Sequence, residues 1–187
     1  ACIQVQALER AGFESLKMAV NFSVRQITDT GFLDLVRRVI TETGVAADRI
    51  ELELPAELLN EDPRMLRELL VSLNDLGVCL ILDDFGKGSC SLVALQQLPL
   101  DVIKIDHGFI RDIPYNVSAT DVASAVIALA HKLHLTVVAE GVETVQQLAF
   151  LKSAGCAQSQ GNLFSYPLDE DALIGFLIRQ YEKPLIS

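Results

Sequence analysis

The sequence has no run of lysine or arginine residues, and its 25 acidic residues outnumber its 15 basic ones, which gives a formal net charge of −10. A surface that binds DNA or RNA needs a basic patch to neutralise phosphates. The charge therefore argues against a nucleic-acid polymer as partner, and the lack of basic runs argues against binding at a membrane surface. A small phosphorylated ligand stays compatible with this charge if metal ions offset the repulsion.

Long apolar runs and paired cysteines are also absent. The longest apolar stretches, such as residues 122–130, are too short to span a bilayer, and we find no signal peptide. Cys2, Cys79, Cys90 and Cys156 show no Cys-x-x-Cys spacing, so we expect reduced thiols. These absences predict a cytoplasmic protein with no membrane segment in this chain.

Two common catalytic patterns are missing as well. The segment Gly86-Lys87-Gly88 lacks the spacing of a phosphate-binding loop. Ser89 and Ser91 have no histidine partner that would indicate a serine hydrolase.

Apolar segments alternate with amphipathic ones along the chain, and half of the residues are apolar, enough for a sizeable core. Strands are expected at residues 16–21, 49–54, 78–83, 102–106, 135–140 and, more weakly, 157–160. Helices are expected at residues 1–11, 31–43, 63–76, 92–98, 121–133, 145–154 and 169–180. Several strands are nearly continuous apolar runs, as a parallel sheet covered on both faces requires. This alternation is compatible with a doubly wound sheet and with a barrel.

Polar residues at the strand ends favour the barrel. One lies at or near the carboxyl end of each predicted strand: Asn21, Glu53, Asp83, Lys104, Glu140 and Gln160. In a closed barrel all strand ends converge on one mouth, whereas an open sheet spreads them along an edge. We therefore predict an α/β fold of the TIM-like (β/α) barrel type. Because the sequence starts on a helix, we expect one N-terminally incomplete domain over residues 1–187, whose first strands lie outside this chain.

The acidic residues at this mouth predict a metal site. Four carboxylates gather there with few cations to neutralise them: Glu53, Asp83, Asp84 and Glu140. Uncompensated carboxylates in a partly dehydrated cleft are costly, and divalent metal removes that cost. With the amide oxygen of Asn21 the ligand set is all oxygen, which favours Mg²⁺ or Mn²⁺ over Zn²⁺.

The tandem Asp83-Asp84 needs a special backbone. Side chains alternate along a strand, so adjacent residues serve one site only where the strand turns, and we expect Gly86 and Gly88 to supply that freedom. A carboxylate that bridges two ions would form a two-metal centre suited to displacement at phosphorus.

Lys104 and Asp106 are two residues apart, so we expect both side chains on the same side of one strand. One interpretation is an inward salt bridge within the barrel. The other is that Lys104 holds an attacking water while Asp106 accepts hydrogen bonds from a ligand.

Across essentially the whole chain, six segments resemble the EAL family of cyclic di-GMP phosphodiesterases in order and spacing. They are residues 19–23 (AVNFS), 51–54 (ELEL), 83–92 (DDFGKGSCSL), 103–106 (IKID), 138–144 (VAEGVET) and 160–167 (QGNLFSYP). The resemblance implies a barrel with one antiparallel strand at its start. It also implies hydrolysis of cyclic di-GMP to linear pGpG in bacterial second-messenger signalling.

The resemblance further implies roles for individual residues. The family's metal positions, for two Mg²⁺ or Mn²⁺ ions, are matched by Asn21, Glu53, Asp83, Asp84 and Glu140. Lys104 matches the residue that positions the catalytic water, and we assign it to the catalytic group with Glu140. Substrate-side positions are matched by Asp106, Gln160 and Gly161. Glu143 matches an acid that holds the loop after Asp84, a loop that also shapes a common homodimer interface.

Departures from the family pattern leave an alternative open. The motif that names the family, with a metal-binding Glu and a substrate Arg, is not in this chain, and residues 53–56 have Pro and Ala where the family has Thr and Glu. The loop after Asp84 carries Lys87, Ser89 and Cys90 in place of the usual residues. The alternative is a non-catalytic EAL domain that acts as a cyclic di-GMP receptor or protein-interaction module. In either case we expect a linked upstream sensor or GGDEF-type domain.

Overall fold

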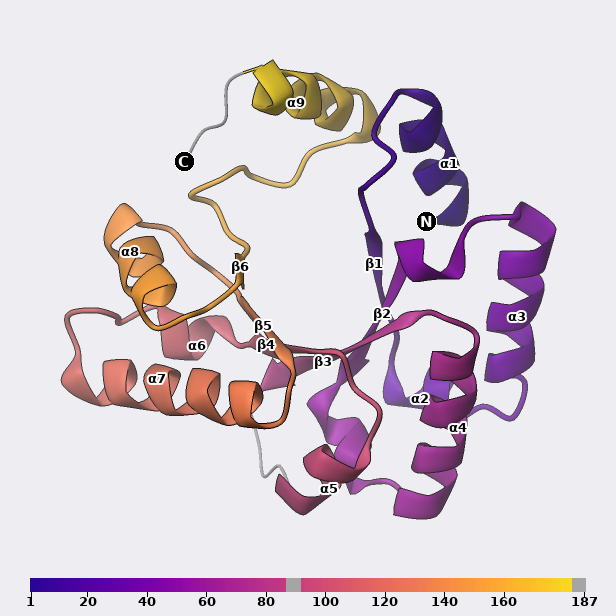
Figure 1. The fold of residues 1–187 in the computed structure, drawn as a ribbon, viewed down its shortest axis with the longest axis horizontal. Coiled ribbons are helices and arrows are strands. Elements are labelled where there is room, and N and C mark those ends of the chain that lie inside the picture. Colours follow the sequence, from indigo (N-terminus) through magenta and orange to yellow (C-terminus); the bar gives the residue numbers. More distant parts are fainter. Residues whose placement is uncertain (87–91, 183–187) are drawn as a thin grey trace.

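In the computed structural model, which describes residues 1–86 and 92–182, six parallel strands form one curved sheet (Figure 1). The strands are β1 (Met18–Asn21), β2 (Ile50–Pro55), β3 (Cys79–Phe85), β4 (Val102–Ile105), β5 (Thr136–Ala139) and β6 (Gln158–Ser159). Their order in the sheet follows the chain, and every neighbouring pair is parallel. The predicted α/β architecture is confirmed. β1 and β6 are the two edges of this sheet.

Helices lie around the outside of the curve (Figure 1). They are α1 (Cys2–Arg10), α2 (Val24–Ile27), α3 (Phe32–Thr43), α4 (Pro63–Asp75), α5 (Leu92–Gln97), α6 (His107–Ile110), α7 (Val117–Lys132), α8 (Val145–Ser153) and α9 (Glu170–Glu182), with 3₁₀ turns η1 (Ala47–Arg49) and η2 (Ala56–Asn60). Each expected strand and helix has a counterpart, while α2, α6 and both 3₁₀ turns were not expected. α7 begins earlier than predicted because the Asn116 side chain accepts a hydrogen bond from the backbone N–H of Ala119 and so caps the helix at that point.

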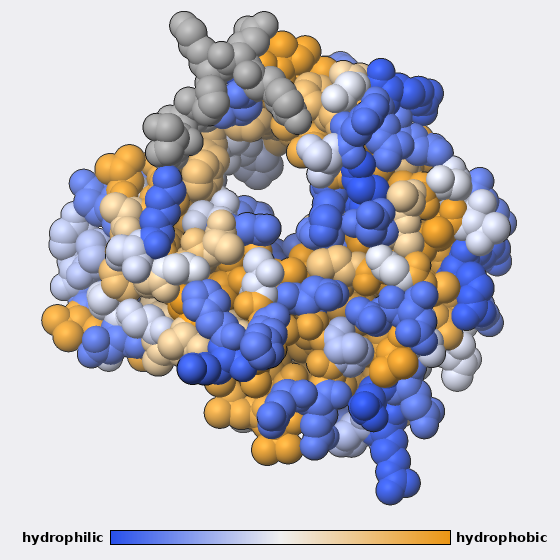
Figure 2. All heavy atoms as spheres, viewed as in Figure 1, coloured by the Kyte–Doolittle hydropathy of each residue, from blue (hydrophilic) through white to orange (hydrophobic). Residues whose placement is uncertain are grey.

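The two faces of the sheet differ in polarity. Leu52 and Leu54 are 2% and 0% exposed and belong to the core beneath the helices. Glu51 and Glu53 alternate with them and face the inside of the curve, where Lys17 Nζ lies 3.5 Å from Glu51 Oε1. Figure 2 shows an opening through the middle of the molecule, bordered on its lower and right sides by hydrophilic residues. The inner face of the sheet therefore carries the charged side chains, together with the apolar Ile81 and Val102, whereas the main apolar core lies outside the sheet.

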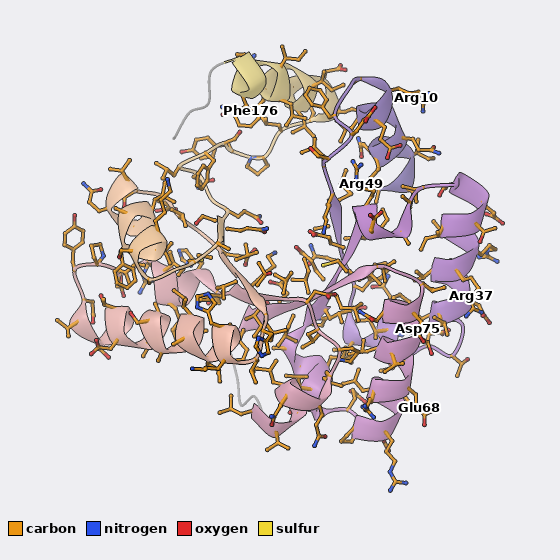
Figure 3. The ribbon with its side chains drawn as sticks, in the orientation of Figure 1. Arg10, Arg37, Arg49, Glu68, Asp75 and Phe176 are labelled. Atoms are coloured by element: carbon orange, nitrogen blue, oxygen red, sulfur yellow. The ribbon has the colours of Figure 1, made fainter. Side chains whose placement is uncertain are left out.

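Arg49 fastens the N-terminal segment to the sheet (Figure 3). Its guanidinium donates hydrogen bonds to the carbonyls of Leu16 and Phe13, and its Nη1 lies 3.6 Å from Glu9 Oε1. The connection between α1 and β1 is thereby tied to the start of β2. At the other end of the chain, α9 lies beside the N-terminal segment (Figure 1), where Gln4 Nε2 donates to Glu170 Oε2 at 2.9 Å.

Cys2, Cys79 and Cys156 are free thiols, and Cys90 lies outside the described residues. Burial, together with the negative charges of Asp101 and Glu51, raises the pKa of Cys79 to about 12, which keeps this thiol protonated. Among the helices that the structure describes, none is both long and apolar enough to cross a membrane.

The helix layer generates a stability prediction on α4. Leu70 is 1% exposed, whereas its neighbour Val71 is 38% exposed. Leu70→Ala leaves a cavity between α4 and the sheet, so we expect it to lower the free energy of unfolding by about 2–5 kcal/mol. Val71→Ala is the control and should cost less than about 1 kcal/mol. Urea unfolding of the two variants measures the difference, and equal losses would show that α4 does not pack as described.

Candidate functional site

The predicted site residues gather at the carboxyl-terminal ends of the strands, which we call the mouth. Asn21 is the last residue of β1 and pairs with Glu53 of β2, while Asp83 of β3 pairs with Pro55. The remaining strand-end residues are Lys104 in β4, Glu140 directly after β5 and Gln160 directly after β6. The curvature of the sheet turns these ends toward a common centre, as the barrel prediction requires.

The backbone at Asp84 adopts a conformation that lets two adjacent carboxylates serve one site. Its φ is +55°, a left-handed conformation that is uncommon outside glycine, and the pairing of β3 with β4 shifts register between Leu82 and Phe85. Asp83 Oδ1 accepts a hydrogen bond from the backbone N–H of Asp84 at 2.8 Å. The turn expected from the glycines begins one step earlier, because the backbone already turns at Asp84 itself. Gly86 follows with φ +107°, and Gly88 lies outside the described residues.

Three carboxylates converge as a result. Asp83, Asp84 and Glu140 each offer an oxygen within 4.8 Å of the others, and all three are half-buried. Carboxylate oxygens at this spacing are the donors that Mg²⁺ and Mn²⁺ prefer. The residues therefore fit a divalent metal. Glu53 lies on β2, next to β3 in the sheet order, and Asn21 lies on β1, one strand further away.

Lys104 is buried at the centre of the mouth, with 4% of its surface exposed. Its Nζ lies 2.6 Å from Glu140 Oε1, 2.8 Å from Glu53 Oε1 and 3.6 Å from Asp83 Oδ1. We call Lys104 and these three carboxylates the ion-pair cluster. Burial lowers the pKa of Lys104, but the hydrogen bonds to Glu140 and Glu53 outweigh burial and raise the pKa above its ordinary value. The mouth thus contains a cation among its acids, as the salt-bridge interpretation of Lys104 predicted.

Asp106 lies just beyond the strand. β4 ends at Ile105, and Asp106 is the N-cap of α6, where its Oδ1 accepts a hydrogen bond from the backbone N–H of Gly108 at 2.9 Å. β4 is therefore one residue shorter than predicted, and the shared side of Lys104 and Asp106 stays a prediction. The inward salt bridge is present, and it joins Lys104 to the acids of β2, β3 and the end of β5.

Gln160 and Gly161 have a tightly held backbone beside Glu140. The N–H of Gln160 donates to the carbonyl of Ala139 at 2.8 Å, and its carbonyl accepts from Val142 N at 3.0 Å. At Gly161 a Cβ would lie 2.2 Å from the carbonyl oxygen of Val142, so only glycine fits. The side chain of Gln160 is exposed at the mouth.

The expected role of Glu143 involves a loop beyond the described residues. The Glu143 side chain is exposed. The loop that it is expected to hold, after Asp84, includes residues 87–91, which the structure does not describe. Lys87, Ser89 and Cys90 lie in the same segment. The loop-holding role of Glu143 stays a prediction.

Gln147 on α8 was not among the predicted site residues. It is buried, with 4% of its surface exposed, and bonds to the loop after Glu140. The available signal was the spacing Thr144-x-x-Gln147, which is typical of a capping box.

Comparison with known proteins identifies the family to which this site belongs. The sequence model of the EAL domain matches residues 1–167. The chain belongs to the EAL domain family. NbdA of Pseudomonas aeruginosa, named a cyclic di-GMP phosphodiesterase, is 46% identical over 177 residues, which cover 95% of this chain.

Solved EAL structures have the same fold. The MucR phosphodiesterase of Pseudomonas aeruginosa in complex with cyclic di-GMP gives a TM-score of 0.88 at 34% identity, covering 92% of this chain and 70% of that one. The complex of Klebsiella pneumoniae BlrP1 with manganese and cyclic di-GMP gives 0.78 at 26% identity, covering 89% of this chain and 43% of that one. The likeness supports use of divalent metal in this fold. The chain spans 23% of the length of NbdA, and MucR is named a bifunctional diguanylate cyclase and phosphodiesterase.

The ion-pair cluster generates a prediction about Lys104. Lys104→Met removes the ammonium and leaves the carboxylates uncompensated, so in EDTA we expect a loss of about 3 kcal/mol, or about 6–12 °C in Tm. Added Mn²⁺ should raise the Tm of this variant more than that of the wild type, because the ion replaces the missing charge.

Lys152→Met is the matched control, since Lys152 is exposed on α8. It should leave both the Tm in EDTA and the response to Mn²⁺ unchanged. An equal Mn²⁺ response in Lys104→Met and in the wild type would contradict the view that lysine and metal neutralise the same carboxylates.

Proposed function

We propose that this domain, in its natural protein, hydrolyses cyclic di-GMP to linear pGpG with divalent metal, in bacterial second-messenger signalling. The observation that carries the proposal is the convergence of Asp83, Asp84 and Glu140 on one point beside a buried lysine. Membership of the EAL family, with relatives named as cyclic di-GMP phosphodiesterases, supports the choice of substrate.

The proposed metal centre uses oxygen donors alone. Asp83, Asp84 and Glu140 would form its core, with Asn21 from β1 and Glu53 from β2 as further ligands for two Mg²⁺ or Mn²⁺ ions. Bound divalent ions supply positive charge to phosphate oxygens and lower the pKa of a bound water.

Lys104 and Glu140 are the proposed catalytic residues of the chain. An ammonium donates hydrogen bonds and accepts none, so Lys104 would orient the attacking water rather than remove its proton. Glu140 holds the ammonium in the mouth through the 2.6 Å contact between Lys104 Nζ and its Oε1. Because Lys104 is buried among Glu53, Asp83 and Glu140, it is fixed before the substrate arrives.

Substrate recognition is assigned to the rim of the mouth. The Asp106 carboxylate accepts a hydrogen bond from Gly108 N, and a carboxylate is an acceptor group that suits an N–H donor on a guanine base. Gln160 presents an exposed amide, and Gly161, held against the Val142 backbone, is assigned to the same substrate-side group. Glu143 keeps its proposed role in holding the loop after Asp84.

We further propose that residues 1–187 are an N-terminally incomplete EAL domain, and that strands outside this sequence pair with the edges β1 and β6. The support is the open sheet and the 70% coverage of the MucR structure. A linked sensor or GGDEF-type domain fits the small share of NbdA that the chain spans. We place the reaction in the cytoplasm, where free thiols such as those of this chain stay reduced.

The activity prediction separates the two kinds of site residue. In the complete natural protein with Mn²⁺, Lys104→Ala should lower kcat for pGpG release by about 100-fold with little change in KM, because a water-positioning group acts mostly in the transition state. Asp106→Asn should chiefly raise KM, because it removes a charged acceptor while its amide oxygen can still cap α6.

Chromatographic assay of pGpG against time gives both parameters. Weaker binding with intact turnover in both variants would contradict the assigned roles. Binding of cyclic di-GMP by the wild type without any pGpG release would favour the alternative, a non-catalytic receptor or interaction module. The departures at Pro55 and Ala56 are the feature that would then explain the loss of activity.

A homodimer through the loop after Asp84 is also part of the proposal. Leu92 and Val93, at the start of α5 directly after that loop, are 54% and 63% exposed and form an apolar surface there. Val93→Glu should therefore shift the natural protein from dimer to monomer in sedimentation velocity. Val145→Glu, on α8 and 59% exposed, is the control and should leave the dimer intact. A wild type that is monomeric at all concentrations would rule this interface out.

A further inference from the structure

Gln147 is a buried polar residue that the proposed chemistry does not use. Among the described residues the buried polar or charged side chains are Glu53, Lys104 and Gln147, with 6%, 4% and 4% exposed. The first two belong to the ion-pair cluster, whereas Gln147 lies on α8. A buried amide is costly unless its polar atoms are hydrogen-bonded, so the partners of this side chain indicate what it holds together.

All four hydrogen-bonding positions of the Gln147 amide are used. Its Oε1 accepts from the backbone N–H groups of Glu143 at 2.8 Å and Thr144 at 3.0 Å. Its Nε2 donates to the carbonyls of Ile110 and Arg111, both at 3.1 Å. One half of the amide therefore binds the loop that leaves Glu140, and the other half binds the end of α6.

α6 in turn contacts the backbone beside the carboxylates of both flanking strands. At Gly86, two residues after Asp84, a Cβ would lie 2.1 Å from the ring of Phe109. At Gly141, directly after Glu140, a Cβ would lie 2.6 Å from the ring of His107. The short helix is thus wedged between the segment that carries the tandem aspartates and the segment that carries Glu140.

We propose that Gln147 is a positioning residue for the metal centre. By fixing α6 against the loop after Glu140, it sets the separation between Glu140 and the carboxylates of Asp83 and Asp84. The same bonds to Ile110 and Arg111 hold the helix that Asp106 caps. This inference rests on the proposed function, because it assigns Gln147 to the geometry of that metal site.

Gln147→Glu tests the link to α6 alone. The glutamate keeps an oxygen for the N–H groups of Glu143 and Thr144, but it has no N–H to donate to the carbonyls of Ile110 and Arg111. Residues that orient metal ligands typically change metal affinity by 10–100-fold, so we expect Mn²⁺ to bind about tenfold more weakly. The probe is Mn²⁺ alone, with free ion measured by electron paramagnetic resonance in the complete natural protein.

The matched control is Gln26→Glu. Gln26 is also the N3 residue of a capping box, on α2, where its Oε1 accepts from Ser23 N at 3.0 Å and Ser23 Oγ at 2.8 Å. Its Mn²⁺ affinity should equal that of the wild type. A variant with both Asp83→Asn and Asp84→Asn measures how much Mn²⁺ binds elsewhere in the protein. This amount is subtracted from the Mn²⁺ bound by every other variant.

A purely structural role for Gln147 would lower the Tm without changing the Mn²⁺ affinity of the folded protein, so affinity is measured well below the Tm with folding checked by circular dichroism. Equal affinity of folded Gln147→Glu and the wild type overturns this inference alone.

If Gln147→Glu does not fold, Phe109→Leu replaces it, because it loosens the contact with Gly86. We expect weaker Mn²⁺ binding from that variant as well, and wild-type affinity overturns the inference. A wild type that binds no more Mn²⁺ than the double aspartate variant overturns the metal centre itself, and this inference with it.

Discussion

Repulsion among carboxylates at the ends of parallel strands is the constraint on which this site depends. Glu53, Asp83 and Glu140 converge because the sheet curves, and like charges at such distances destabilise the fold unless a cation lies among them. In this structure that cation is Lys104, which contacts all three acids. The lysine can therefore hold these acids together, and the same residues are the ligands that we propose for divalent ions.

The backbone around the mouth is shaped to serve that convergence. Asp84 adopts a left-handed conformation that turns its carboxylate toward the side occupied by Asp83, at a cost of the order of 1 kcal/mol. Gly86 and Gly141 have positive φ and pack closely against the side chains of α6. Strain and close packing of this kind persist only where the surrounding structure holds them, and the buried amide of Gln147 is one of the restraints that does so.

The sequence predicts this site well because each residue of the ion-pair cluster is a polar side chain at the end of an apolar strand. What it does not predict depends on where strands stop and how far side chains reach. β4 ends one residue early, so Asp106 caps a helix that has too few residues to show a periodic pattern. Period-two alternation places Lys104 on the inner face. It does not predict which carboxylates the ammonium at the end of this flexible side chain will contact. Gln147 precedes the apolar Leu148 in a helix of weak amphipathicity, so its burial is not evident from the pattern, and only its capping-box spacing marks it.

Diffraction from crystals grown with Mn²⁺, with data collected at the manganese absorption edge, tests the central claim most directly. The account predicts anomalous density within bonding distance of Asp83, Asp84 and Glu140, with the ammonium of Lys104 moved away from at least one of its carboxylate partners. Absence of anomalous density at these carboxylates, with Lys104 still bound to Glu53 and Glu140, would contradict it.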